Sequence, residues 1–193
     1  MLNFLNDEEL MVLSFVKEAT KTFEETHNWK HSFDVAKLAT IMLNRKDVFY
    51  LALLHNFCDY KYPESISREE LTNFINTNLI QYSYIDKLID KVSFNYHKNH
   101  RDEQVPKILE IVRDVVRGYE DLGEKGIKRL ELYSKKLGKK KDDAVQYCFD
   151  KLLKMVPEGY IINVNKEIIN NHNIIVKYVN DYYKYPKVKY LKI

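Results

Sequence analysis

Thr26-His-Asn-Trp-Lys-His-Ser-Phe-Asp-Val-Ala-Lys-Leu-Ala39 sets a histidine, His31, at the head of a helical pattern. A second segment, Tyr50-Leu-Ala-Leu-Leu-His-Asn-Phe-Cys-Asp-Tyr-Lys-Tyr-Pro63, brings His55 to the end of an apolar run. Neutral imidazole nitrogen is a common ligand of divalent metals. Two histidines at the ends of separate helices therefore indicate a candidate metal site, and the next question is which side chains complete it.

The composition bounds the class of protein. The chain has 193 residues, of which 45% are hydrophobic and 31% charged, as in a globular protein with one well-buried core. The net charge of +3 is too small to indicate a nucleic-acid partner. Cys58 and Cys148 make no disulfide framework, and the N-terminal residues lack the features of a signal peptide. No apolar run approaches the roughly 20 residues that cross a membrane. We therefore expect a soluble, cytoplasmic protein.

Hydrophobic periodicity predicts an all-α fold. Only five glycines and four prolines leave little room for the turns of an all-β protein. Apolar residues recur at helical spacing, which predicts helices at residues 7–25, 30–44, 46–58, 80–92, 105–119, 120–137, 142–156 and 164–183. The 46–58 helix is apolar on most sides, which is typical of an element at the centre of a domain. Ser67 and Glu70 form a capping-box pattern that starts one more helix. Residues 95–104 are expected to form a loop, and residues 186–193 a loose tail or short strand.

Several motifs, in this order, resemble the HD-domain phosphohydrolases, and most closely the small bacterial-type branch similar to nucleotide pyrophosphohydrolases. The first is His27-Asn-Trp-Lys-His31, where that branch reads His-Asp-Trp-x-His. The second is Leu53-Leu-His-Asn-Phe-Cys-Asp-Tyr-Lys61, where it reads Leu-Leu-His-Asp with an Asp and a Lys a few residues on. Further similarity lies in Ile111-Val-Arg-Asp114, Asp121-Leu-Gly-Glu-Lys-Gly-Ile127 and Phe149-Asp-Lys-Leu-Leu-Lys154. The resemblance implies one HD-like domain over residues 1–185, a bundle of eight to nine helices with a small helical extension at residues 118–142.

The resemblance also implies where a metal would bind. The family's ligands are two histidines, the Asp that follows the second histidine, and a distant Asp. Carried over by position, the histidines are His31 and His55, but the two acidic ligands are replaced by Asn56 and Val116. The segment after Val116, Gly118-Tyr-Glu-Asp-Leu-Gly123, is one residue longer than the family pattern.

Asp114 is the nearest carboxylate that would replace the ligand lost at Val116. Successive residues of an α-helix turn by about 100°. The inward face of this helix is therefore expected to carry Val105, Ile108, Leu109, Val112 and Val116. Asp114 is then turned about 160° away from Val116 by the same geometry, and only a local bulge would bring it to the site.

Loss of both carboxylates argues against ordinary catalysis. Carboxylates give such a site the negative charge that holds a divalent ion, which then activates water and neutralises a phosphoryl group. We therefore expect no bound metal, or a weakly bound divalent cation (Mn, Mg, Ni or Fe). The protein is then a degenerate phosphohydrolase-like protein that binds a nucleotide-like ligand or another protein. The alternative is an active metal-dependent nucleotide phosphohydrolase in which Asp114, Asn56 or Cys58 completes a remodelled site.

Four further residues are candidates for contact with a phosphate-bearing ligand. Asp59 and Lys61 match the family's pair after the second histidine, where they would orient a water and a phosphate; a solvated ion pair is the alternative. Lys98 and Arg117 are candidate ligand-binding cations, and solvent-facing surface residues are the alternative. His172 falls on the apolar stripe of the last helix and is expected to be a packed core histidine. The expected partner is a nucleotide, a phosphate or a protein, and neither a membrane nor a nucleic acid.

Overall fold

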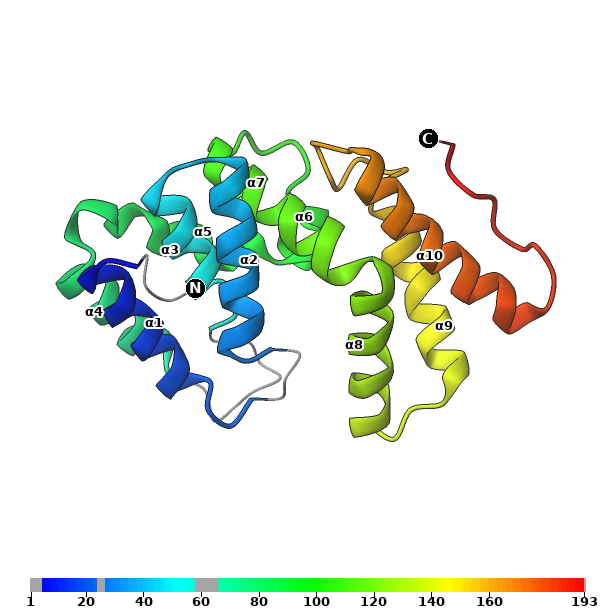
Figure 1. Ribbon diagram of the computed structural model, residues 1–193, viewed down its shortest axis with the longest axis horizontal. Coiled ribbons are helices and arrows are strands. Elements are labelled where there is room, and N and C mark those ends of the chain that lie inside the picture. The colour runs from blue at the N-terminus through cyan, green and yellow to red at the C-terminus, as the bar shows by residue number, and fades with distance from the viewer. Residues whose placement is uncertain (1–4, 24–26, 58–65, 193) are drawn as a thin grey trace. The chain divides into compact units, whose positions relative to one another are not determined.

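The computed structural model describes residues 5–23, 27–57 and 66–192, and these residues form helices and no strand. The predicted all-α fold class is confirmed. The chain divides into two compact units, Met1–Val112 and Arg113–Ile193. In Figure 1 the helices of the first unit run from blue to green and those of the second from green to red. The expectation of one domain over residues 1–185 stays a prediction.

The first unit is built around a central helix. Its elements are α1 (Asp7–Ala19), α2 (Trp29–Met42), α3 (Lys46–Leu54), α4 (Arg68–Asn78), the 3₁₀ turn η2 (Ile80–Ile85), α5 (Asp86–Ile89), η3 (Asp90–Val92), α6 (Phe94–Asn99) and the first part of α7 (Lys107–Val115). Every residue of α3 from Asp47 to Leu54 is buried, as its apolar character predicts. α2 packs along α3, and α1 contacts both (Figure 1). Because residues 43–45 alone join α2 to α3, the two helices run antiparallel, and the start of α2 lies beside the end of α3.

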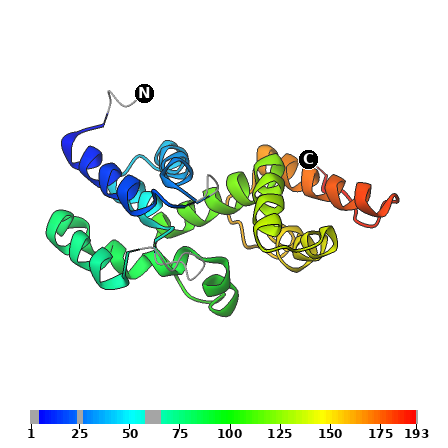
Figure 2. The same ribbon diagram turned by 90° about the horizontal axis from the view of Figure 1, so that it is seen from below.

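The second unit is a set of packed helices around its own apolar core. Its elements after α7 are the π-helix η4 (Val116–Asp121), α8 (Gly123–Lys136), α9 (Lys141–Asp150), η5 (Leu152–Lys154) and α10 (Lys166–Tyr183). α8 packs against α9, α10 and η4, and Figure 2 shows α8 and α9 side by side. The core is formed by Leu130, Val145, Cys148, Ile168, Ile175 and Val176. His172 is 2% exposed within this core, so its prediction as a packed histidine is confirmed.

Local elements differ from the sequence prediction in several places. The helix predicted at residues 80–92 is divided into η2, α5 and η3. Residues 95–104 are not all loop, because α6 begins at Phe94, where the Ser93 hydroxyl accepts a hydrogen bond from the Tyr96 N–H at 3.1 Å. The first helix ends at Ala19 instead of continuing to residue 25. The helix predicted at residues 142–156 ends at Asp150 and gives way to the 3₁₀ turn η5. The capping box of Ser67 and Glu70 is confirmed.

The helix predicted at residues 105–119 is also not continuous. α7 ends at Val115, and the chain continues as a π-helix from Val116 to Asp121. A π-helical turn holds one residue more than an α-helical turn, and such turns often occur at functional sites. The wider turn is held in place by the Asn171 side chain, which donates to the Gly118 carbonyl at 2.9 Å. The expectation that this segment is one residue longer than the family pattern stays a prediction.

None of the helices in the described part of the chain combines the length and the apolar character that a membrane span requires. Cys148 is a buried free thiol, and burial raises its pKa to about 12. This thiol is therefore protonated and packed as a small apolar group.

Candidate ligand-binding site

His31 lies in the first turns of α2 and is only 5% exposed. Its position depends on the start of the helix, where the Asn28 side chain accepts a hydrogen bond from the Lys30 N–H at 2.9 Å. Asn28 therefore acts as the N-cap, a role in which Asn and Asp are equally suited. The departure from the family pattern at Asn28 leaves the local fold around His31 intact.

His55 follows the last residue of α3 and is half-buried. Its Nδ1 lies 2.6 Å from the carbonyl oxygen of Ala52. Because a carbonyl oxygen can only accept, Nδ1 carries the proton, and the lone pair of the neutral ring is on Nε2. A histidine held by Nδ1 on a backbone carbonyl is the arrangement that orients many metal-binding imidazoles.

The antiparallel packing of α2 and α3 brings the two histidines together. The ring centroids of His31 and His55 are 5.4 Å apart and the rings are tilted by 60°. The Nε2 atoms of both rings are buried. A third imidazole, His27, has its centroid 6.3 Å from that of His31. The first unit thus holds a small cluster of imidazole rings at the junction of two helices.

Asn56 follows His55 and is half-buried, with its amide nitrogen enclosed. Its side chain offers a neutral oxygen where the family pattern has a carboxylate. Cys58, Asp59 and Lys61 lie outside the described residues, so their predicted roles stay predictions.

Asp114 belongs to the second unit, where its carboxylate binds the segment before α10. One oxygen accepts the Ile162 N–H at 2.8 Å; the other accepts the Asn163 N–H at 2.8 Å and the Asn163 side-chain amide at 2.5 Å. The burial differs from the expected inward face in one respect, because Val116 is only half-buried whereas Asp114 is completely buried against residues 162 and 163. The rotation of about 100° per residue applies to the α-helix up to Val115, because the chain continues from Val116 as a π-helix.

The two candidate phosphate-binding cations have different surroundings. Lys98 lies on α6 and is exposed. Arg117 is 1% exposed in the second unit and donates from Nη1 to the Tyr160 carbonyl at 2.7 Å. Burial, together with repulsion from Arg113, lowers the pKa of Arg117 to about 10, so its guanidinium remains charged at neutral pH. The observed contact gives Arg117 a structural role in its own unit, and its ligand-binding role stays a prediction.

The donors do not fit the metal centre that the resemblance implies. In the first unit, His31 and His55 supply two neutral imidazoles and Asn56 a neutral amide. In the second unit, Val116 supplies no donor, and both oxygens of Asp114 already accept hydrogen bonds. Among the residues that the structure describes, no group of three His, Cys, Asp or Glu side chains could hold a metal ion. What remains in the first unit is a polar, imidazole-lined site that can donate to or accept from a ligand.

Two solved structures show the same fold. The first is YpgQ from Bacillus subtilis in complex with ADP, with a TM-score of 0.68 at 20% identity over 92% of this chain and 94% of that chain. The second is a structural-genomics target from Lactobacillus plantarum, with a TM-score of 0.74 at 16% identity over 94% of this chain and 98% of that chain. The likeness establishes an all-helical fold, consistent with an HD-like one. No protein-family model and no curated protein matches the sequence.

The structure adds residues that sequence reasoning did not assign. His27 joins the imidazole cluster from the turn before the N-cap Asn28, so helical spacing does not predict its approach to His31. Asn163 and Tyr160, which bind Asp114 and Arg117, follow Pro157 in a segment with no periodic pattern. Only their tertiary contacts identify them.

Proposed function

We propose that this chain is a nucleotide-binding HD-like protein that has lost the metal centre of the phosphohydrolases it resembles and does not turn over its ligand. Its fold is shared with YpgQ, which was crystallised in complex with ADP. The proposal places the ligand's phosphates near His31 and His55 and gives Lys98 the role of a phosphate-binding cation.

The observation that carries this proposal is the donor set around the paired histidines. Two imidazoles and one amide have no formal negative charge, so they attract a divalent cation far less than a site with carboxylates does. The same neutral donors impose no repulsion on a phosphate. A nucleotide is favoured over a protein as the partner because the ADP complex of the neighbour supplies a chemical precedent for this fold.

The second candidate function is an active metal-dependent nucleotide phosphohydrolase. It is favoured by the 5.4 Å approach of the His31 and His55 rings and by the Nδ1 anchor of His55, which are features of metal sites. In this case Asp59 would orient the attacking water and Lys61 or Lys98 would hold phosphate, with Asn56, Cys58 or Asp114 completing the ligands.

The deciding experiment measures ADP binding and metal binding separately. The protein, stripped of metal with a chelator, is titrated with ADP by calorimetry and melted with and without manganese. We expect ADP to raise the melting temperature in the absence of manganese, because a ligand that binds only the folded state stabilises it by mass action. We expect manganese alone to cause no shift, and no phosphate or pyrophosphate to be released from nucleoside triphosphates. Manganese-dependent release would establish the second function, and no response to millimolar ADP would refute nucleotide binding.

Variants localise the site. Lys98→Ala should weaken ADP binding about tenfold, since one charge-assisted hydrogen bond is lost. Lys87→Ala is the matched control, because Lys87 is an exposed lysine on α5 of the same unit. Equal affinities of the two variants would remove Lys98 from the site.

Restoration tests the placement of the lost ligands. The variant Asn56→Asp, which places a carboxylate next to His55 in the first unit, should bind manganese and melt at a higher temperature when manganese is added. A variant that folds but takes up no manganese would show that the carry-over of this acidic ligand from the family pattern is wrong.

A further inference from the structure

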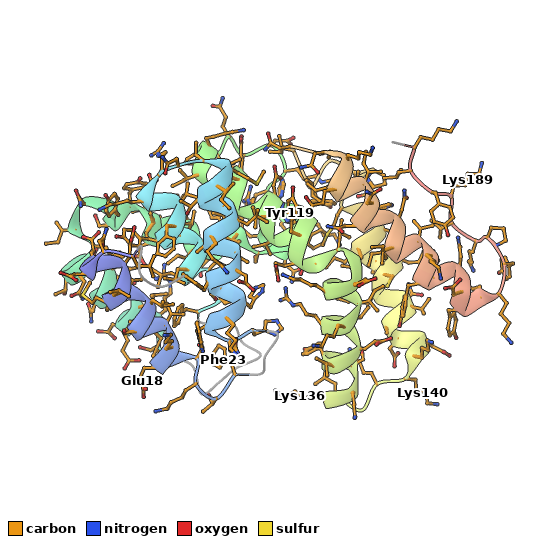
Figure 3. All side chains as sticks on the ribbon, in the orientation of Figure 1. Glu18, Phe23, Tyr119, Lys136, Lys140 and Lys189 are labelled. Atoms are coloured by element: carbon orange, nitrogen blue, oxygen red, sulfur yellow. The ribbon has the colours of Figure 1, made fainter. Side chains whose placement is uncertain are left out.

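Two asparagines on α10 hold the segment that follows this helix. Asn180 donates from Nδ2 to the Val188 carbonyl and accepts the Val188 N–H, both at 2.9 Å. Asn173 makes the same pair of bonds with Leu191, at 2.9 Å to its carbonyl and 2.8 Å from its N–H. Each side-chain amide thus pairs with both backbone groups of one residue, as a neighbouring strand does. In Figures 1 and 3 the segment, on which Lys189 lies, turns back along α10.

The spacing of the two asparagines matches the spacing of an extended chain. Asn173 and Asn180 are seven residues apart, so they share a face of α10 and are separated by about 10.5 Å along its axis. Val188 and Leu191 are three residues apart, which corresponds to about 9–10 Å in an extended or polyproline II conformation. In the polyproline II conformation, every third residue also points the same way. Asn173 and Asn180 therefore form two amide clamps, that is, side-chain amides that each bond both backbone groups of one residue. Their spacing along α10 matches the spacing of the bonded residues in an extended peptide.

A lysine fixes the register of this contact. The Lys187 ammonium lies 4.2 Å from the ring centroid of Tyr183 and 5.8 Å from that of Phe149. A cation over aromatic faces is attracted by the ring quadrupole. The two asparagine side chains bond only backbone groups, so the contact of Lys187 with Tyr183 and Phe149 helps to distinguish this register from one shifted by a residue.

The segment is attached lightly. Val188 and Leu191 are half-buried, whereas the other residues from Tyr185 to Lys192 are exposed. Its turn begins at Lys184, the one non-glycine residue with positive φ (60°) among those described. A hollow of about 540 Å³ lies at this turn, lined by Asn180, Asp181, Lys184, Tyr185, Pro186 and Tyr190. Little apolar surface is buried, so local opening of the segment is expected to cost less than unfolding of the unit.

We propose that the face of α10 bearing Asn173 and Asn180 is a binding surface for an extended peptide with a lysine just before the first clamped residue. Residues 185–192 are its built-in occupant, which detaches and rebinds. The surface recognises the backbone through two amide clamps and selects the register through the Lys187 contact with Tyr183 and Phe149.

The test separates the surface from its occupant. A variant that lacks residues 185–193, with folding checked by circular dichroism, is titrated with a capped synthetic peptide of residues 185–192. The side-chain amide resonances of Asn173 and Asn180 are followed by NMR. A short linker gives an effective concentration of the order of millimolar, so peptide is added to about 10 mM. We expect both asparagine amides to shift on titration, and no shift with the intact chain, whose surface is already occupied.

Two peptides and two variants test the chemistry. A peptide N-methylated at Val188 cannot donate to Asn180 and should bind about tenfold more weakly, and replacing Lys187 by alanine in the peptide should weaken binding severalfold. In the truncated chain, Asn180→Ala should weaken binding of the unmodified peptide about as much as N-methylation of Val188 does. Asn170→Ala is the matched control, because Asn170 is exposed on the same helix, and it should bind the unmodified peptide normally.

The proposal fails if no asparagine amide responds to about 10 mM peptide in a folded truncated chain. It also fails if the N-methylated peptide binds as tightly as the unmodified one. In the intact chain, hydrogen exchange gives an independent check. The Val188 and Leu191 amides should be protected from exchange, and Asn180→Ala should remove the protection of the Val188 amide. Exchange of both amides at the rate of an unstructured peptide would overturn the proposal without any truncation.

Discussion

The two units use chemically reactive side chains in opposite ways. In the first unit His31 and His55 meet at the junction of two helices, with their ring centroids 5.4 Å apart. In the second unit Asp114 and Arg117 are fully buried and bind backbone groups of the segment that leads into α10. The comparison teaches that a carboxylate near a metal motif in sequence can be committed to holding the fold. The presence of a possible metal ligand in a sequence motif is therefore weaker evidence for metal binding than the hydrogen bonds that the same side chain makes in the structure.

The largest effect is expected at Asp114. Asp114→Ala removes the acceptor of two backbone N–H groups and one amide, so it should lower the free energy of unfolding by about 3 kcal/mol. Urea denaturation measures the change. Asp150→Ala is the control: Asp150 is exposed and its carboxylate accepts a hydrogen bond from the exposed Gln146 side chain at 2.9 Å, so its loss should cost about 0.5 kcal/mol or less. Similar costs for both variants would show that the Asp114 contacts do not stabilise the second unit.

The next effect concerns the pH dependence of stability. Burial lowers the pKa of His172 to about 4, whereas an unfolded histidine titrates near 6.5. As the pH falls below about 6.5 the unfolded chain takes up this proton first, so stability is full above that pH and declines toward pH 4. Between pH 7 and pH 5 the loss due to His172 should be about 2 kcal/mol. His172→Leu should remove this part of the slope in urea titrations, and an unchanged slope would contradict a neutral buried imidazole.

A smaller effect is expected where the π-helix meets α10. A Cβ at Gly118 would lie 2.8 Å from Cγ1 of Ile168, which is too close for packed carbons. Gly118→Ala should therefore destabilise the unit by about 1–2 kcal/mol, although alanine normally stabilises a helix relative to glycine by about 1 kcal/mol. In an Ile168→Ala background the same substitution should be neutral or stabilising. A double-mutant cycle without coupling would contradict this packing.

The smallest effect on stability is expected at His55, which belongs to the first unit. His55→Gln loses the hydrogen bond to the Ala52 carbonyl, so the free energy of unfolding should fall by about 1 kcal/mol or less. The same variant should weaken ADP binding. A stability loss as large as that of Asp114→Ala would mean that His55 is a structural histidine, and the contrast between the two units would disappear.

Much of the fold was predictable because its signals are local. The periodicity of apolar residues predicted most of the helices, and the apolar character of residues 46–58 predicted the burial of α3. Ser67 and Glu70 predicted a helix start because a capping box involves residues only three apart. The segment at residues 95–104 was predicted as loop because its polar composition hides a short helix that is capped by Ser93.

The sequence by itself determined the helical class and placed His31 and His55 at the ends of two predicted helices, since both follow from residue identity and short-range spacing. The 5.4 Å approach of the two rings depends on the packing of α2 on α3, and the replacement of two acidic ligands, which rests on the resemblance, stays a prediction. Only the tertiary structure decided what Asp114 does, because its partners Ile162 and Asn163 are 48 and 49 residues away. It also decided that the chain continues after Val115 as a π-helix, since a π-helix has no sequence signal of its own and is held by contacts such as that from Asn171 to Gly118. Local spacing fixes which groups are present on a helix, and packing between distant segments fixes which of them are already bound.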